Sequence, residues 1–182
     1  MRRARRSRQL VWAGAATAAG AVGVLLLLLL LPEPSDHVAQ GDISGPACIE
    51  DGDTLHINGR RSYGECRNGH GVVLYGIDAP ELAQTCHHQG TAWPCGRQAA
   101  STLLHLTRGK TVTCVGNSQD PKGSLIAVCH VDGQDLNGLM VRMGMAVSVG
   151  ARYALEEGAA RHARAGIWMG TFERPAEWRA AH

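Results

Sequence analysis

The chain has 182 residues, a length that allows one domain plus an extension. It carries 18 Lys and Arg against 16 Asp and Glu, but five of the arginines precede Gln9, so the rest of the chain holds 13 basic residues against all 16 acidic ones. A formal charge near −3 excludes the class of domain that binds polyanions through a wholly basic face, and leaves only a local basic patch.

The N-terminal part has the pattern of a membrane anchor. No charged residue occurs from Leu10 to Leu31, and residues 24–31 are all aliphatic. A run of 22 uncharged residues is long enough to cross a bilayer as a helix, and the arginines before it predict a cytoplasmic N-terminus. We expect a basic cytoplasmic segment over 1–9 and a single transmembrane helix over 10–31 in the inner (cytoplasmic) membrane.

Two further segments follow from this interpretation. Residues 32–46 are rich in Pro, Gly, Ser and Asp and have no apolar period, which predicts a linker. The domain is then expected over 47–179, on the periplasmic or extracellular side. A cleaved signal peptide is the alternative for the apolar run, although the following residues offer no good A-x-A site.

All six cysteines follow the apolar run: Cys48, Cys66, Cys86, Cys95, Cys114 and Cys129. An even number in an exported domain favours disulfides, and six cysteines allow about 15 pairings.

Of these pairings we prefer Cys114–Cys129 across a hairpin and Cys86–Cys95 closing a short loop, which leaves Cys48–Cys66. Zinc is the alternative because His87 and His88 lie between two cysteines, but the spacing matches no C-x-x-C knuckle.

Local patterns predict several short strands and then helices. Asp51-Gly52-Asp53 has the chemistry of a tight turn between two strands. Ala99, Leu103 and Leu106 share one helical face that Gly109 ends. The order suggests an α+β domain with a small OB-type β-barrel and helices outside it. Strands are expected over 47–59 (interrupted by the turn), 72–77, 110–116 and 124–133, and helices over 95–109, 135–144 and 155–166.

Four acidic residues carry the candidate chemistry: Asp51, Asp53, Asp78 and Glu81. If their strands are neighbours, Asp53 and Asp78 converge and, with a backbone carbonyl, suit a hard cation such as calcium. Glu81 could then hold or deprotonate a water, as metal-assisted phosphodiester hydrolysis requires. By spacing alone the signal is weak, because such residues are more often parts of a turn and a loop.

Six motifs occur along the domain in a fixed order: "DGDTLHING", "LYGIDAPELAQTC", "WPCGRQAA", "DPKGSLIAVC", "GQDLNGLMVRMGMA" and "EEGAARHARAGIWMGTFERPAEWR". In their order and spacing the domain strongly resembles the staphylococcal-nuclease-like (thermonuclease) family, in particular its exported, membrane-anchored bacterial branch with paired cysteines. The resemblance covers about 46–179.

The resemblance implies a fold, an activity and a site. The implied fold is a five-stranded OB-fold β-barrel with about three helices, and the implied activity is calcium-dependent cleavage of DNA and RNA. The calcium ligands fall on Asp53, Asp78 and the backbone carbonyl of Ala79, the outer aspartate on Asp51 and the water-activating glutamate on Glu81. Nucleic acid is the implied partner; the chain is expected to be a monomer, and no protein partner is indicated.

The two phosphate-binding arginines of the family pattern are replaced. One position, five residues before Asp78, holds Val73, and the other, on the later hairpin, holds Ser124. Charge builds up on phosphate oxygens during attack, and positioned cations must meet it. Lys122, which replaces a tyrosine of the pattern, is a possible substitute, as are Arg60, Arg61 and Arg67 in the long preceding loop.

Two functions therefore remain open from the sequence. One is an anchored, extracytoplasmic, calcium-dependent nuclease of low or no activity. The alternative is an inactive OB-fold binding or structural module of the cell envelope.

Overall fold

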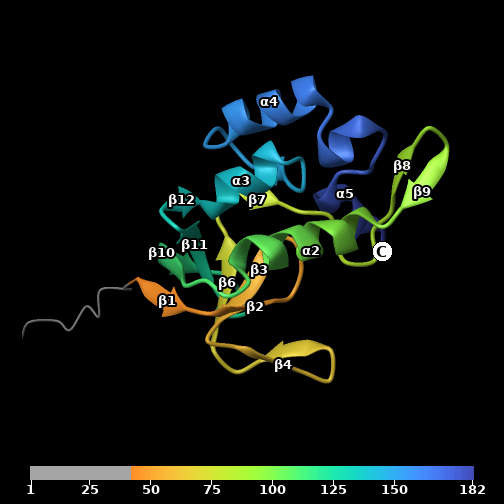
Figure 1. Cartoon of the computed structure of the whole chain (residues 1–182). Coiled ribbons are helices and arrows are strands. Elements are labelled where there is room, and N and C mark those ends of the chain that lie inside the picture. The colour runs from red at the N-terminus through yellow and green to blue at the C-terminus, as the bar shows by residue number, and fades with distance from the viewer. Residues whose placement is uncertain (1–41) are drawn as a thin grey trace, which may run out of the picture. The chain divides into compact units, whose positions relative to one another are not determined.

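The structure is a computed structural model that describes residues 42–182 (Figure 1). The basic segment and transmembrane helix expected over 1–31, and most of the linker, lie outside the described residues. Within residues 42–182, no helix has the length and apolarity needed to cross a membrane.

A mixed sheet forms the centre of the domain. Its strands follow the order β1-β10-β11-β6-β3-β2, with β12 paired to β11. The β11–β6 pair is parallel, and the other pairs are antiparallel. The strands are β1 (Ile43–Gly45), β2 (Ala47–Ile49), β3 (Thr54–Ile57), β6 (His70–Leu74), β10 (Val112–Gln119), β11 (Leu125–Val131) and β12 (Gln134–Asp135).

Helices and three small strand pairs surround this sheet (Figure 1). α2 packs against β2, and α3 packs against β11 and α4. The helices are α2 (Cys95–Thr107), α3 (Leu136–Arg142), α4 (Ala154–Ala163), the 3-10 turn η1 (Gly166–Met169) and α5 (Pro175–Ala181). The small pairs are β4 (Arg60–Ser62) with β5 (Glu65–Arg67), β7 (Ile77–Asp78) with β13 (Val147–Ser148), and β8 (Cys86–His88) with β9 (Thr91–Trp93).

The observed α+β fold differs in three details from the expected barrel. The central sheet is a half-barrel of seven strands instead of five, because β1 adds at one edge and β12 pairs with the end of β11. Four α-helices are present in residues 42–182 instead of about three, because α5 was not expected. Residues 43–45, placed in the linker by sequence, pair as β1 with β10.

Apolar side chains at strand and helix periods form the core. In β3, Leu55 and Ile57 are fully buried and alternate with partly exposed neighbours, as expected for a half-buried strand. In α2, Ala99 and Leu103 are fully buried, which confirms the predicted apolar face. Gly109 has φ 71°, a conformation that glycine adopts without strain, just after this helix.

Three disulfides join Cys48 to Cys66, Cys86 to Cys95 and Cys114 to Cys129, the same pairs that the sequence favoured. Because Cys86 and Cys95 are bonded to each other, they are not available as the zinc ligands of the alternative interpretation.

Candidate active site

A hollow of about 550 Å³ gathers the four candidate acids together with Val73, Lys122 and Ser124. It lies where β3 begins and β6 and β7 end, and is completed by the β10–β11 turn and α5. Because β3 and β6 are neighbours in the sheet, acids far apart in the sequence face the same space. The charged lining residues are Glu50, Asp51, Asp53, Asp78, Glu81, Asp120, Lys122 and Arg179, and the uncharged ones include Val73, Ser124 and Val149.

The turn before β3 is held by its own aspartate. Asp51 Oδ1 accepts hydrogen bonds from the backbone N–H groups of Asp53 (3.0 Å) and Thr54 (2.7 Å). Gly52 permits close packing, since a Cβ there would lie 2.6 Å from Ala79 Cβ. The role of Asp51 in the structure is therefore to shape the turn that presents Asp53.

Asp53 links this turn to the next strand. Its Oδ2 accepts a hydrogen bond of 2.6 Å from the backbone N–H of Ala79, and its Oδ1 accepts one of 3.1 Å from Thr54 Oγ1. Burial raises the pKa of the Asp53 carboxyl well above its usual value, and the negative charge of Asp51 raises it further. The Ala79 hydrogen bond opposes this shift but does not cancel it.

Asp78 and Glu81 are bound by an arginine that sequence reasoning missed. Arg179 Nη1 donates to Asp78 Oδ1 at 2.7 Å and to Glu81 Oε1 at 2.9 Å, and Nη2 donates to Asp78 Oδ2 at 3.2 Å. The Asp78 side chain is only 12% exposed, whereas that of Arg179 is 46% exposed. This bidentate, charge-assisted contact is of the strong kind.

The loop that carries Glu81 is fixed by buried polar contacts. Gln84 is fully buried; its Oε1 accepts from Glu81 N at 3.2 Å, and its Nε2 donates to the Glu173 carbonyl at 2.7 Å. A Cβ on Gly96 would lie 1.6 Å from the Glu81 carbonyl oxygen, so only glycine fits at this point of α2. Gln84 thus connects the Glu81 loop to the segment that leads into α5.

The two positions where the resemblance implies arginines hold small uncharged side chains that line the hollow. Val73 pairs with Thr54 of β3 and with Ile126 of β11. Ser124 follows a turn in which Asp120 Oδ1 accepts from the backbone N–H groups of Lys122 and Ser124. Of the proposed substitute cations, Lys122 lines the hollow.

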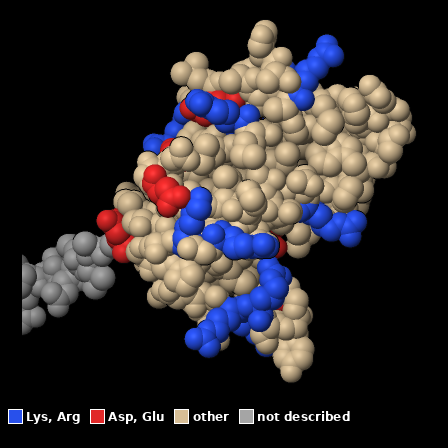
Figure 2. Space-filling model, in the orientation of Figure 1, with Lys and Arg blue, Asp and Glu red and all other residues tan. Residues whose placement is uncertain are grey.

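The other three candidate cations lie elsewhere. Arg60, Arg61 and Arg67 belong to the β4–β5 hairpin, where Figure 2 shows basic side chains gathered at the bottom of the view. This hairpin joins the ends of β3 and β6 that point away from the hollow. Arg61 donates to the carbonyls of Ile49 and Gly64, and Arg67 pairs with Glu65 at 3.2 Å.

The carboxylates as arranged do not fit a calcium ion. Both oxygens of Asp78 accept from Arg179, and Asp53 Oδ2 accepts from Ala79 N. Across residues 42–182 no group of three His, Cys, Asp or Glu side chains could hold a metal. The expected ligands Asp53 and Asp78 thus share one hollow, but a guanidinium holds Asp78.

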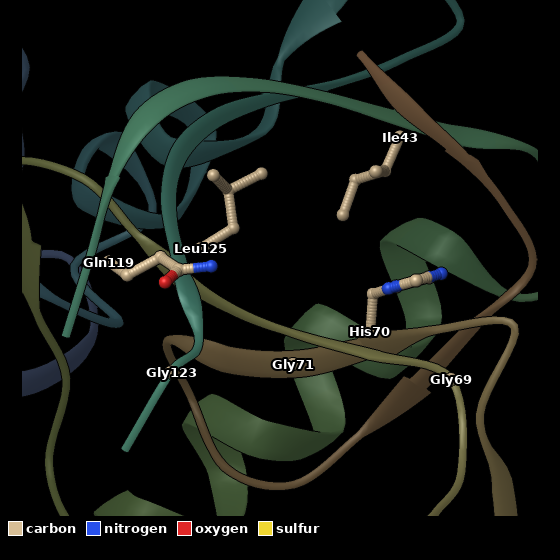
Figure 3. A pocket seen from close by; sticks show the side chains of 7 residues that line it. All are labelled: Ile43, Gly69, His70, Gly71, Gln119, Gly123 and Leu125. Atoms are coloured by element: carbon tan, nitrogen blue, oxygen red, sulfur yellow. The ribbon is translucent and has the colours of Figure 1, made fainter. Parts of the chain in front are cut away.

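A second hollow of about 300 Å³ lies on the other side of the β10–β11 turn (Figure 3). Gln119 and Leu125 face it from one side, and Ile43 and His70 from the other (Figure 3). No Asp, Glu, Lys or Arg lines this hollow, so the charged chemistry belongs to the first one.

Known proteins resemble this chain over most of the described domain. Residues 71–170 match the family described as Staphylococcal nuclease homologue. Succinoglycan biosynthesis protein ExoI of Rhizobium meliloti (strain 1021) is 32% identical over 154 residues, which cover 81% of this chain and 74% of that protein.

Two plant proteins match a shorter part. Staphylococcal-like nuclease CAN1 of Arabidopsis thaliana is 29% identical, and probable staphylococcal-like nuclease CAN1 of Oryza sativa subsp. japonica is 30% identical, each over 114 residues and 59% of this chain. In both cases the match spans 32% of the plant protein, about a third of its length.

Proposed function

Because the chain belongs to the staphylococcal nuclease homologue family, we propose that its domain binds nucleic-acid phosphodiesters and hydrolyses them slowly or not at all. The family assignment supports the substrate class, and the arrangement of the hollow supports the low rate. Calcium dependence is implied by the family resemblance and stays a prediction for this chain.

We infer the low rate of hydrolysis from the basic side chains that line the hollow. Val73 and Ser124 line it at the positions where the resemblance implies arginines, and of its lining residues only Lys122 and Arg179 are basic. In phosphoryl transfer a single arginine contributes about 10³–10⁵ to the rate. Lys122 is exposed and offers a point charge without a bidentate fork, and Arg179 is already bound to carboxylates.

The chain's own residues still suit phosphodiester chemistry in part. Glu81 is 29% exposed and lies at the hollow, where a carboxylate can accept a proton from a water. In the structure its Oε1 accepts from Arg179, so this role requires the contact to open. The geometry therefore supports substrate binding better than rapid turnover.

A second candidate function is a non-catalytic module of the cell envelope. The relative that matches the largest share of the chain among those described above is named a succinoglycan biosynthesis protein, not a nuclease. A module that assists succinoglycan biosynthesis would keep the fold without needing the arginines that the resemblance implies. Binding of succinoglycan but not of DNA would favour this candidate.

We also propose that the domain is held outside the cytoplasm by the segment 10–31, with residues 1–9 in the cytoplasm. The uncharged run and the arginines before it support this topology. The three disulfides support an oxidising compartment. Protease added to intact spheroplasts should digest the domain; full protection would contradict the proposed topology.

The deciding experiment is digestion of single-stranded DNA by the full chain in detergent, with calcium or with chelator. We expect little cleavage by the wild type and a gain of at least tenfold when Val73→Arg and Ser124→Arg are combined. Val115→Arg is the matched control, because Val115 is an exposed strand valine outside the hollow.

The outcomes separate the hypotheses. Wild-type activity close to that of an arginine-bearing relative, abolished by Glu81→Gln, would refute the proposed low rate. Absence of DNA binding by every variant would refute the nucleic-acid function and leave the envelope module.

A further inference from the structure

The hollow contains an internal cation at the point where its acids meet. One nitrogen, Arg179 Nη1, bridges Asp78 Oδ1 at 2.7 Å and Glu81 Oε1 at 2.9 Å, while Nη2 completes a fork on Asp78. Asp78 and Glu81 come from β7 and the following loop, about a hundred residues before α5 in sequence, at separations of 101 and 98 residues. Arg179 therefore neutralises two carboxylates that a metal ion would otherwise have to neutralise.

We propose that Arg179 is the resident cation of this hollow, carried on α5, and that a divalent metal reaches Asp78 and Glu81 only by displacing it. The inference rests on the proposed function, because the metal concerned is the one that phosphodiester hydrolysis in this family would use. In this proposal α5, which we call the strap, holds Arg179 at the site. Arg179 then controls the access of a metal by binding the carboxylates of Asp78 and Glu81.

Charge makes the two cations mutually exclusive. Both oxygens of Asp78 already accept from the guanidinium, so a metal sharing them would lie within a few ångströms of a permanently positive group. Repulsion between a divalent ion and a guanidinium at that range is strong, because Asp78 is largely shielded from solvent. Binding of either cation must weaken binding of the other by the same factor.

The strap has few other attachments. α5 has seven residues, of which only Pro175 is buried. The segment before it is fixed by the Gln84–Glu173 hydrogen bond, but the described contacts of Arg179 within residues 42–182 are those to Asp78 and Glu81. Releasing Arg179 therefore requires only that its side chain or this one short helix moves, while the chain up to Glu173 stays in place.

The test is calcium affinity, measured by isothermal titration calorimetry on the full chain in detergent. Arg179→Gln should bind calcium at least tenfold more tightly than the wild type, because the competing cation is gone. Arg142→Gln is the charge-matched control: Arg142 lies on α3, 66% exposed and outside the hollow, and its loss should change the affinity less than twofold. Arg179→Lys, which keeps the charge without the fork, should lie between wild type and Arg179→Gln.

A second measurement follows α5 directly. Calcium should accelerate amide hydrogen exchange over residues 175–181 in the wild type. In Arg179→Gln this exchange should be fast already, and calcium should add nothing to it. A purely structural surface ion pair would give neither the gain in calcium affinity nor the calcium-dependent exchange.

Three results would overturn the inference: equal or weaker calcium binding by Arg179→Gln, no calcium binding by any variant, or exchange of α5 that calcium does not change. These results differ from failure of the proposed function. If DNA is bound but Arg179→Gln leaves calcium affinity unchanged, only the strap is refuted. If calcium affinity rises in Arg179→Gln while no variant binds or cleaves DNA, the strap stands and the nuclease function fails.

Discussion

Replacing Gln84 by alanine should separate the Glu81 loop from the segment before α5. The Gln84 side chain is fully buried and joins two backbone groups that have no other described partner: the N–H of Glu81, at 3.2 Å, and the carbonyl of Glu173, at 2.7 Å. The Gln84 backbone makes two further bonds, with the Glu81 carbonyl and the Gly96 N–H, which the substitution leaves intact. The perturbation is therefore confined to the side-chain bridge.

The expected loss of stability follows from these contacts. Leaving a buried donor or acceptor without a partner costs about 1–3 kcal/mol, and the low end applies to each of the two groups here because their hydrogen bonds are only partly buried. Removal of the side chain beyond Cβ also leaves a cavity, whose cost depends on how far the site collapses. We expect Gln84→Ala to lower the free energy of unfolding by about 3–5 kcal/mol, a large part of the 5–15 kcal/mol that is typical of a domain.

Urea unfolding of the disulfide-intact protein measures this loss. Gln98→Ala is the matched control, because Gln98 is exposed on α2 and its truncation should change stability by less than about 0.5 kcal/mol. Gln84→Glu keeps an acceptor for the Glu81 N–H but loses the donor to the Glu173 carbonyl, so its free energy of unfolding should be lower than that of the wild type. A loss below about 1 kcal/mol for Gln84→Ala would refute the bridge, because loss of two partly buried hydrogen bonds and of a fully buried side chain together cannot cost so little.

Three further substitutions test the surroundings of the hollow. Asp53→Asn should stabilise the protein at neutral pH. The pKa of Asp53 in the folded protein is raised above the ordinary 3.8, so wild-type stability falls as the pH rises from 3.8 through the folded pKa. Thermal unfolding from pH 3 to 8 should therefore show that the advantage of the variant grows with pH. Gly96→Ala should lower the free energy of unfolding in urea by more than about 2 kcal/mol, because the added Cβ would lie 1.6 Å from the Glu81 carbonyl oxygen. Its control is Gly158→Ala on α4, which has open space around it and should be neutral or stabilising. Asn137→Ala should cost about 3–5 kcal/mol by the same assay, because this fully buried amide bonds three backbone groups.

Local patterns predicted the turn that carries Asp51 and Asp53, whereas the assignment of these residues to a site came from the family resemblance. Asp51-Gly52-Asp53 has a turn signature that depends only on neighbouring residues, and the structure has that turn. The strand predicted after this turn is β3, in which Leu55 and Ile57 are buried. The sequence predicted that Asp53 and Asp78 converge if their strands are neighbours; β3 and β6 are neighbours in the structure, and both aspartates line one hollow.

The half of the site that lies on α5 could not be predicted in the same way. Pro175 at the first helical position, Glu177 in the first turn and Arg179 in the last turn are local signals for a helix there. Nothing in "RPAEWR" indicates that Arg179 reaches a carboxylate 101 residues earlier, because this contact depends on where the whole domain places the C-terminus. The edge strand β1 was missed for a related reason: its pairing with β10 gives the short segment 43–45 a structure that its own composition does not specify.

Asp78 needs a cation whichever function the hollow serves, and this need can be tested without any metal. Its side chain is 12% exposed, and an ionised carboxylate at that depth is costly unless it is paired. Arg179→Gln should therefore lower stability in chelator by about 1–3 kcal/mol, less than the roughly 3–5 kcal/mol of a fully buried pair because Arg179 is half exposed. Asp78→Asn added to Arg179→Gln should recover most of the loss in urea unfolding, since it removes the unpaired charge. If the double variant is as unstable as the sum of both single variants, the pair does not interact as the structure indicates, and the strap loses its physical basis.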